Sequence, residues 1–123
     1  MRSISAFASV ALLLTGITVA FAHAELKRAV PPAGGTVAAA PNEVTVIFSE
    51  PLETAFSTLV VRDSAGKQVD KGDAHIDKDD RTTMRVSLQP LPRGTYTVKW
   101  RVVTVDTHRT EATFTFTVSE DAK

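Results

Sequence analysis

His23 stands directly after an apolar segment that ends in Ala20-Phe21-Ala22. If a protease cuts after Ala22, His23 becomes the first residue, and its free α-amine and imidazole Nδ1 can chelate one metal ion through a six-membered ring. An internal histidine cannot do this, because its backbone nitrogen is an amide. Nitrogen-rich coordination of this kind suits Cu(II), the strongest binder among the common divalent first-row ions. The alternative is that some residue must come first, and that it happens to be a histidine.

A second potential ligand pair consists of Asp106 and His108, which lie between two strand-like segments. Residues two positions apart on an extended segment project to the same side, so this spacing can present a carboxylate oxygen and an imidazole nitrogen to one point. Connections between strands often carry functional residues. The alternative is a solvated loop whose aspartate is hydrogen-bonded within a turn.

Glu50 and His75 are weaker candidates. Glu50 precedes Pro51, which favours an extended backbone at Glu50. Near a metal this carboxylate would be a distant ligand or would orient the α-amine; otherwise it is an exposed acid at the end of a strand. His75 lies among aspartates, but their spacing lacks the glycine and terminal glutamate of a calcium-binding EF-hand loop. We therefore predict that residues 73–81 form a solvated loop.

The segment before His23 has the features of an export signal. Arg2 supplies a positive charge, residues 6–22 are almost wholly apolar, and the segment closes with a small-x-small pattern. The alternative is an uncleaved membrane anchor, which needs about 20 apolar residues, but polar residues interrupt this segment. We predict a cleaved signal peptide at 1–22, a mature domain at 23–123, and export with no membrane insertion after cleavage.

The composition excludes several classes of function. The chain has 14 basic and 14 acidic residues and no cysteine. The balanced charge gives no electrostatic reason for binding nucleic acid or an anionic membrane. Without cysteine there is no disulfide, thiolate nucleophile or cysteine-based metal site. No nucleophile motif, glycine-rich phosphate loop or HExxH metalloprotease motif is present, so nothing indicates hydrolysis.

The elements that would position these residues are β-strands. Residues 43–48, 57–63, 83–88, 95–102 and 113–118 are rich in valine, threonine and aromatic residues, mostly in alternation with polar ones. That pattern is typical of antiparallel sheets, and turn-forming residues separate the runs. We therefore predict one all-β domain, a β-sandwich or Greek-key barrel. Its predicted inner faces contain Val44, Val46, Phe48, Met84, Val86, Leu88, Tyr96, Val98, Trp100, Val102, Phe114, Phe116 and Val118.

Together these features resemble the CopC family of periplasmic copper-binding proteins. The resemblance covers essentially the whole mature chain through "HAELKRAVPPAGGTV", "VIFSEPLE" and "LPRGTYTVKWRVVTVDTHRTEATFTFTV". The last segment is similar to the family's G-x-Y-x-V-x-W-x-V-x-S-x-D-x-H pattern. The resemblance implies an immunoglobulin-like Greek-key β-barrel related to the cupredoxins, with a Cu(II) site at one end. The ligands it implies are the amine and imidazole of His23, the Asp106 carboxylate and the His108 imidazole, with Glu50 close to the copper.

The sequence departs from some family members in its sulfur content. Those members add a Cu(I) site in a methionine-rich segment, whereas residues 60–80 of this chain contain no methionine. The two methionines are Met1, within the predicted signal, and Met84, on the apolar face of a strand. Because soft Cu(I) prefers thioether and thiolate ligands, we predict one Cu(II) per chain and no Cu(I) site.

The resulting prediction is a monomeric, non-enzymatic, periplasmic Cu(II) carrier or buffer in copper tolerance or uptake. It would exchange copper with an inner-membrane transporter. One alternative is a copper-dependent oxidative enzyme, since an N-terminal histidine chelate also occurs in enzymes that cleave polysaccharides. One Trp and one Tyr offer no flat aromatic surface for a polymer, and an aspartate ligand would fill part of the equatorial plane of the copper. A second alternative is a metal-free immunoglobulin-like structural module.

Overall fold

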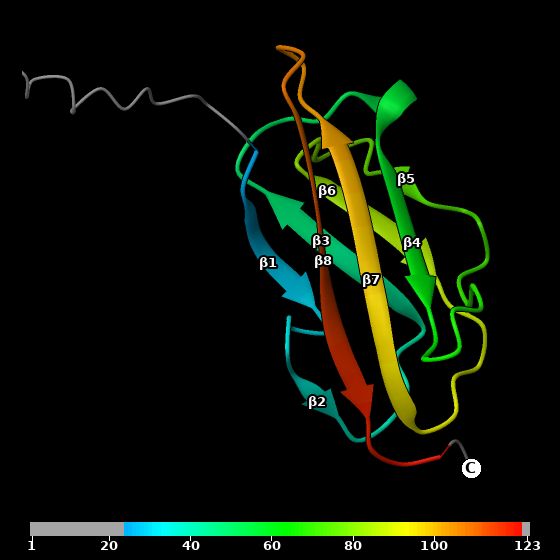
Figure 1. The fold of residues 1–123 in the computed structure, drawn as a ribbon. Helices are drawn as coiled ribbons and strands as arrows, with labels where there is room; N and C mark the ends of the chain where they lie inside the picture. Colours follow the sequence, from blue (N-terminus) through cyan, green and yellow to red (C-terminus); the bar gives the residue numbers. More distant parts are fainter. Residues whose placement is uncertain (1–23, 122–123) are drawn as a thin grey trace, which may run out of the picture.

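A computed structural model describes residues 24–121 of the chain, which form two β-sheets packed face to face (Figure 1). The first sheet has the order β1-β3-β6-β5 and contains β1 (Leu26–Val30), β3 (Glu43–Phe48), β6 (Thr83–Ser87) and β5 (His75–Ile76). The second has the order β2-β8-β7-β4 and contains β2 (Thr36–Val37), β8 (Arg109–Val118), β7 (Gly94–Val103) and β4 (Thr58–Arg62). A short 3-10 helix, η2 (Thr54–Phe56), precedes β4. The predicted all-β sandwich is confirmed.

The core lies between the sheets, where the alternating apolar residues meet. All the predicted inner-face residues are buried except Phe114, which is partly buried and packs against the core. Trp100 contacts Phe48 edge to face, with ring centroids 4.9 Å apart. Tyr96 stacks on Phe116, and its hydroxyl donates a 2.6 Å hydrogen bond to the Pro92 carbonyl. A tyrosine that bonds the backbone a few residues upstream is a feature of immunoglobulin-like sandwiches.

The long hairpin of β7 and β8 supports the loop that contains Asp106 and His108. The two strands pair antiparallel without a register shift from Gly94 opposite Val118 to Val103 opposite Arg109. On the inner face Val98, Trp100 and Val102 are buried, whereas lysine and arginine alternate with them on the outer face of β7. This continuous ladder holds the short loop after Val103 at a defined place.

Three short strands were not predicted. β2 and β5 have two residues each, too few for alternation to be visible. β1 is an edge strand whose pairing with β3 shifts between Leu26 and Arg28, so its pattern is irregular. The prediction that residues 73–81 form a loop is therefore wrong at His75–Ile76, because these two residues pair with β6. Within residues 24–121 no helix is long and apolar enough to span a membrane.

Candidate metal centre

Three segments that are distant in the sequence meet at one end of the sandwich. The Glu25 amide donates to the Ser49 hydroxyl at 2.9 Å, and the Ser49 amide donates to the Glu25 carbonyl at 2.9 Å. The Ala24 carbonyl accepts a 3.4 Å hydrogen bond from the Thr110 hydroxyl at the start of β8. Ala24 is only 3% exposed. The chain is thus fixed, from its first described residue, between the end of β3 and the start of β8.

The loop between β7 and β8 closes tightly over five residues. The Thr104 amide donates to the His108 carbonyl at 2.9 Å, and the Thr107 amide donates to the Thr104 carbonyl at 2.8 Å. Thr107 has a φ of +73°, in the left-handed region that β-branched residues rarely adopt. The Val105 amide donates to the Pro51 carbonyl at 3.2 Å. That bond ties the loop to the segment that contains Glu50.

Asp106 and His108 contact each other at this loop. His108 Nδ1 lies 3.2 Å from Asp106 Oδ1, and the two side chains are 39% and 49% exposed, respectively. The Thr104 hydroxyl donates a second hydrogen bond to Asp106 Oδ1. This bond, and then the neighbouring His108, hold the pKa of the Asp106 carboxyl below its usual value. The carboxylate is therefore favoured in its ionised form, which is the form that binds metal.

Glu50 lies at the same end and is partly buried. Its side chain makes no hydrogen bond or ion pair with residues 24–121. His23, the fourth predicted site residue, lies outside the described residues. Within those residues no group of three or more histidine, cysteine or acidic side chains is placed to hold a metal. The structure thus brings together Asp106 and His108, with Glu50 nearby, but does not test the complete ligand set.

The aspartate-rich segment around His75 is arranged differently. The Asp73 carboxylate accepts a 2.8 Å hydrogen bond from the Ser87 amide, and Asp77 forms a 3.0 Å ion pair with Arg85. His75 Nδ1 lies 3.0 Å from the backbone carbonyl of Asp73. These contacts connect the segment to β6. They do not bring the side chains together around a common point.

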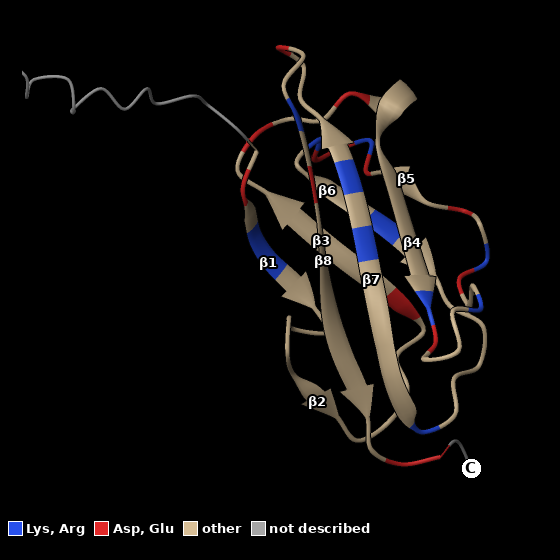
Figure 2. Ribbon diagram, in the orientation of Figure 1, with Lys and Arg blue, Asp and Glu red and all other residues tan. Residues whose placement is uncertain are grey.

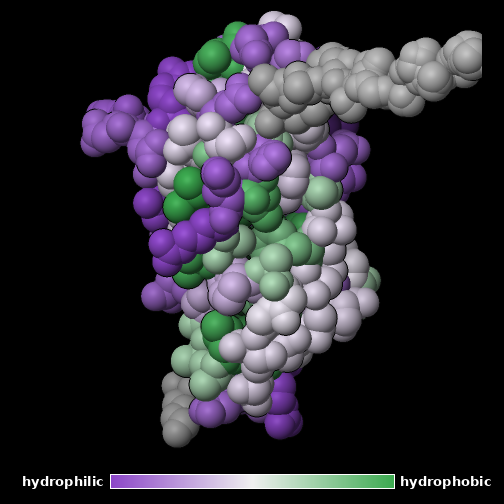
Figure 3. Space-filling model, turned by 90° about the vertical axis from the view of Figure 1, so that its left-hand side faces the viewer, coloured by the Kyte–Doolittle hydropathy of each residue, from purple (hydrophilic) through white to green (hydrophobic). Residues whose placement is uncertain are grey.

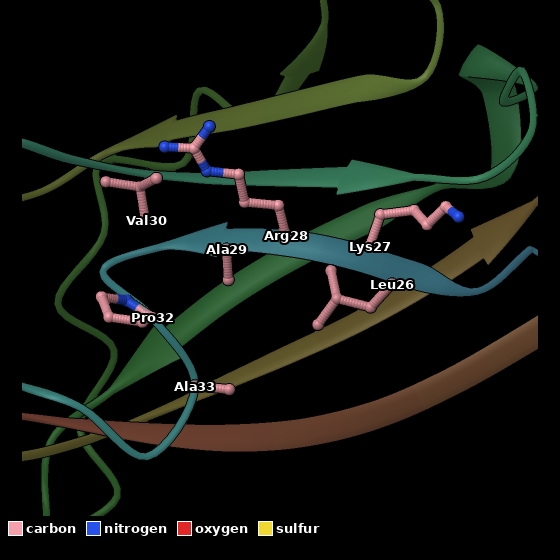
Figure 4. Close-up of a pocket in the computed structure, with 7 residues that line it drawn as sticks. All are labelled: Leu26, Lys27, Arg28, Ala29, Val30, Pro32 and Ala33. Atoms are coloured by element: carbon pink, nitrogen blue, oxygen red, sulfur yellow. The ribbon is translucent and has the colours of Figure 1, made fainter.

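A hollow of about 530 Å³ lies beside β1, and neither Asp106 nor His108 lines it. Figure 4 shows its lining, which is apolar except for Lys27 and Arg28 and contains no carboxylate or imidazole. Figure 3 shows apolar residues gathered on this side of the molecule. The hollow contributes no metal-binding group.

Thr104 contacts both candidate ligands of this loop, which the sequence analysis did not predict. It is fully buried, and its hydroxyl contacts both Asp106 and the backbone of His108. Two signals were available: a hydroxyl interrupts the apolar run at residues 102–105, and the G-x-Y-x-V-x-W-x-V-x-S-x-D-x-H pattern has a serine at this position. Neither signal shows which groups the hydroxyl contacts.

Comparison with known proteins places this architecture in a family. The CopC domain model matches residues 26–119. Protein YobA of Escherichia coli (strain K12) is 36% identical over 89% of this chain and 91% of its own. Copper resistance protein C of Escherichia coli is 36% identical over 80% of this chain and 83% of its own. The crystal structure of CopC from Methylosinus trichosporium OB3b aligns with a TM-score of 0.75 and 35% identity, covering 82% of this chain and 98% of that one. The chain therefore belongs to the CopC family.

Proposed function

We propose that this protein binds Cu(II) in the periplasm and acts as a copper carrier or buffer in copper tolerance or uptake. Membership of the CopC family supports a role in copper resistance or transport, since one relative is named copper resistance protein C. The observation that carries the proposal is the contact between Asp106 and His108 at the end of the sandwich where Ala24 is anchored. The fold brings a carboxylate and an imidazole to the end where the mature chain would begin.

The proposed ligands are the α-amine and imidazole of His23, one oxygen of Asp106 and the imidazole of His108. A peptide bond keeps consecutive Cα atoms 3.8 Å apart, so the position of Ala24 limits how far the preceding residue can be from the site. In this proposal, removal of residues 1–22 creates the amine ligand. Three nitrogen donors and one oxygen donor suit Cu(II), and a four-donor set accounts for one ion per chain.

Glu50 would act beside the copper. Its partly buried carboxylate has no partner within residues 24–121, yet it lies next to Pro51, whose carbonyl bonds the β7–β8 loop. In the proposed site it accepts a hydrogen bond from the His23 amine or binds copper as a distant ligand. Either role would orient the first residue of the mature chain.

The donor set also favours Cu(II) over Cu(I), and binding over catalysis. No cysteine is present, and the Met84 side chain is 1% exposed in the core, so no thioether is available to Cu(I) at the surface of residues 24–121. The Asp106 carboxylate would fill an equatorial position that oxygen activation requires. We accordingly propose a monomeric carrier that exchanges copper with an inner-membrane transporter.

Equilibrium dialysis against Cu(II), with protein that begins at His23, tests this function. We expect one Cu(II) per chain and weaker binding by His108→Ala and Asp106→Ala. His75→Ala is the matched control, because it removes a second exposed histidine at another place, and it should leave binding nearly unchanged. Equal losses in all three variants would show that the site is misplaced. Competition with a Cu(I)-specific chelator should detect no tight Cu(I) site.

A further inference from the structure

Thr104 is a polar residue that packing alone does not explain. It is 0% exposed and follows two buried valines, Val102 and Val103. Its backbone pairs with that of Leu52. A buried hydroxyl is costly unless it is hydrogen-bonded, and valine has nearly the same shape without that requirement. The hydrogen-bond partners of the hydroxyl therefore indicate why this position holds a threonine.

The partners of the Thr104 hydroxyl are the two residues proposed as ligands from this loop. Oγ1 donates a hydrogen bond to Asp106 Oδ1 and accepts one from the His108 amide at 3.2 Å. A hydroxyl has one donor hydrogen and two acceptor lone pairs, so both kinds of bond form at the same time. One buried atom thus links the Asp106 side chain to the His108 backbone.

We propose that Thr104 is a positioning residue for the metal centre, which holds Asp106 and His108 in the arrangement that binds Cu(II). The inference rests on the proposed function, because it concerns the same site. Thr104 does not touch the metal. Its hydroxyl and the His108 ring both contact Oδ1 of Asp106, so together they fix the orientation of that carboxylate beside the imidazole.

The conformation of the loop indicates why an anchor is needed. Thr107, between the two ligands, has a φ of +73°, and such a conformation persists only when the surrounding contacts enforce it. The Thr104 carbonyl accepts from the Thr107 amide at 2.8 Å, and the Thr104 hydroxyl holds the residues on either side. A site whose ligands are already fixed loses less conformational entropy when the metal binds.

The test compares Thr104→Val with Thr104→Ser, each made in protein that begins at His23. Valine removes the hydroxyl with little change of shape, whereas serine keeps it. We expect Thr104→Val to weaken Cu(II) binding by about 10–100-fold, the usual effect of losing a group that orients a ligand, and to alter the Cu(II) paramagnetic resonance spectrum. Thr104→Ser should restore both the affinity and the spectrum. Thermal unfolding of the copper-free proteins checks that each variant is folded.

Thr83→Val is the matched control for a purely structural effect. Thr83 is 2% exposed, and its hydroxyl also donates to an aspartate, Asp80, at 3.0 Å. We expect Thr83→Val to lower the stability without changing Cu(II) affinity or the spectrum. In an Asp106→Ala background, Thr104→Val should cost less affinity than in the wild type, because coupled residues are not additive.

Three results would overturn the inference. The first is wild-type Cu(II) affinity in Thr104→Val, and the second is an equal loss of affinity in Thr104→Ser and Thr104→Val. The third is the same loss from Thr104→Val in the wild-type and Asp106→Ala backgrounds. Each of them requires that the wild-type chain binds Cu(II), so the proposed function would stand. If the wild-type chain itself binds no Cu(II), the proposed function fails, and this inference fails with it.

Discussion

Two segments of the protein, residues 73–80 and residues 104–108, each combine a histidine with aspartate, but the fold uses them differently. In the first, Asp73, Asp77 and Asp80 point to separate partners on and near β6. In the second, the side chains of Asp106 and His108 contact each other. Figure 2 shows acidic residues in both regions. The number of potential ligands in a segment is therefore a weaker reason to propose a metal site than a contact between them.

The difference arises from what supports each segment. Residues 73–80 run beside β6, where Asp73 and Asp80 accept hydrogen bonds and Asp77 pairs with Arg85. These carboxylates therefore stabilise the fold. Residues 104–108 close a ten-residue hairpin ladder, and the buried Thr104 hydroxyl supplies the anchor. This anchor holds the Asp106 carboxylate beside the His108 ring. The predictions below test this contrast, from the largest expected effect to the smallest.

The largest effect should come from the first residue of the mature chain. In protein that begins with Gly-His23, the backbone nitrogen of His23 is an amide. It therefore cannot bind copper together with Asp106 and His108. We expect its Cu(II) affinity to fall by about 10²–10⁴-fold, the gain that linked binding groups give each other. Titration of both proteins, with circular dichroism as a check of folding, measures this. Equal affinities would leave His23 as a simple imidazole ligand at most.

A change in residues 73–80 should lower the stability of the fold and leave Cu(II) binding unchanged. Asp77→Ala removes the ion pair with Arg85, whose side chain is 36% exposed. Because solvent screens a pair this exposed, we expect a loss of at most about 1 kcal/mol in the free energy of unfolding. Urea denaturation measures that loss, and the Cu(II) affinity should not change. A clear fall in Cu(II) affinity would mean that residues 73–80 contribute to the site.

The smallest effect should appear in the acid dependence of stability. Hydrogen bonds from Thr82, and then from Thr83, lower the pKa of Asp80 in the folded protein. The unfolded chain therefore binds more protons there, so this stabilisation is present above the ordinary aspartate pKa of about 3.9 and is lost as the pH falls towards the folded pKa. Asp80→Asn should flatten the fall in stability below about pH 4.

Asp79→Asn is the matched control for this pH effect. It removes the same charge from an aspartate whose side chain makes no hydrogen bond or ion pair within residues 24–121. Urea denaturation of copper-free protein at several pH values compares the two variants. An unchanged slope in Asp80→Asn would contradict the assigned role of these hydrogen bonds.

Much of the scaffold was predictable from the sequence, because alternation directly reports which face of a strand is buried. β3, β6, β7 and β8 follow the predicted pattern, with Phe114 less buried than expected. β5 is too short to show a pattern, and its existence depends on pairing with β6. Local alternation cannot reveal a strand that exists only through its partner.

The candidate site was predictable only in part. The D-x-H spacing identified Asp106 and His108, which the structure places in contact. The role of Thr104 and the left-handed backbone of Thr107 were not predictable, since both depend on how the loop closes in three dimensions. His23 lies outside the described residues, so its part in the site stays a prediction.

The measurement that tests the central claim most directly is a nuclear magnetic resonance titration of the chain that begins at His23, with substoichiometric Cu(II). The unpaired electron of Cu(II) broadens the signals of nearby nuclei, so the amides that vanish first locate the metal. We predict early loss of the amide signals of Ala24, Glu25, Glu50 and residues 104–110, while those of residues 75–80 persist. Early loss of the signals of residues 75–80, with those of residues 104–110 unaffected, would contradict the account.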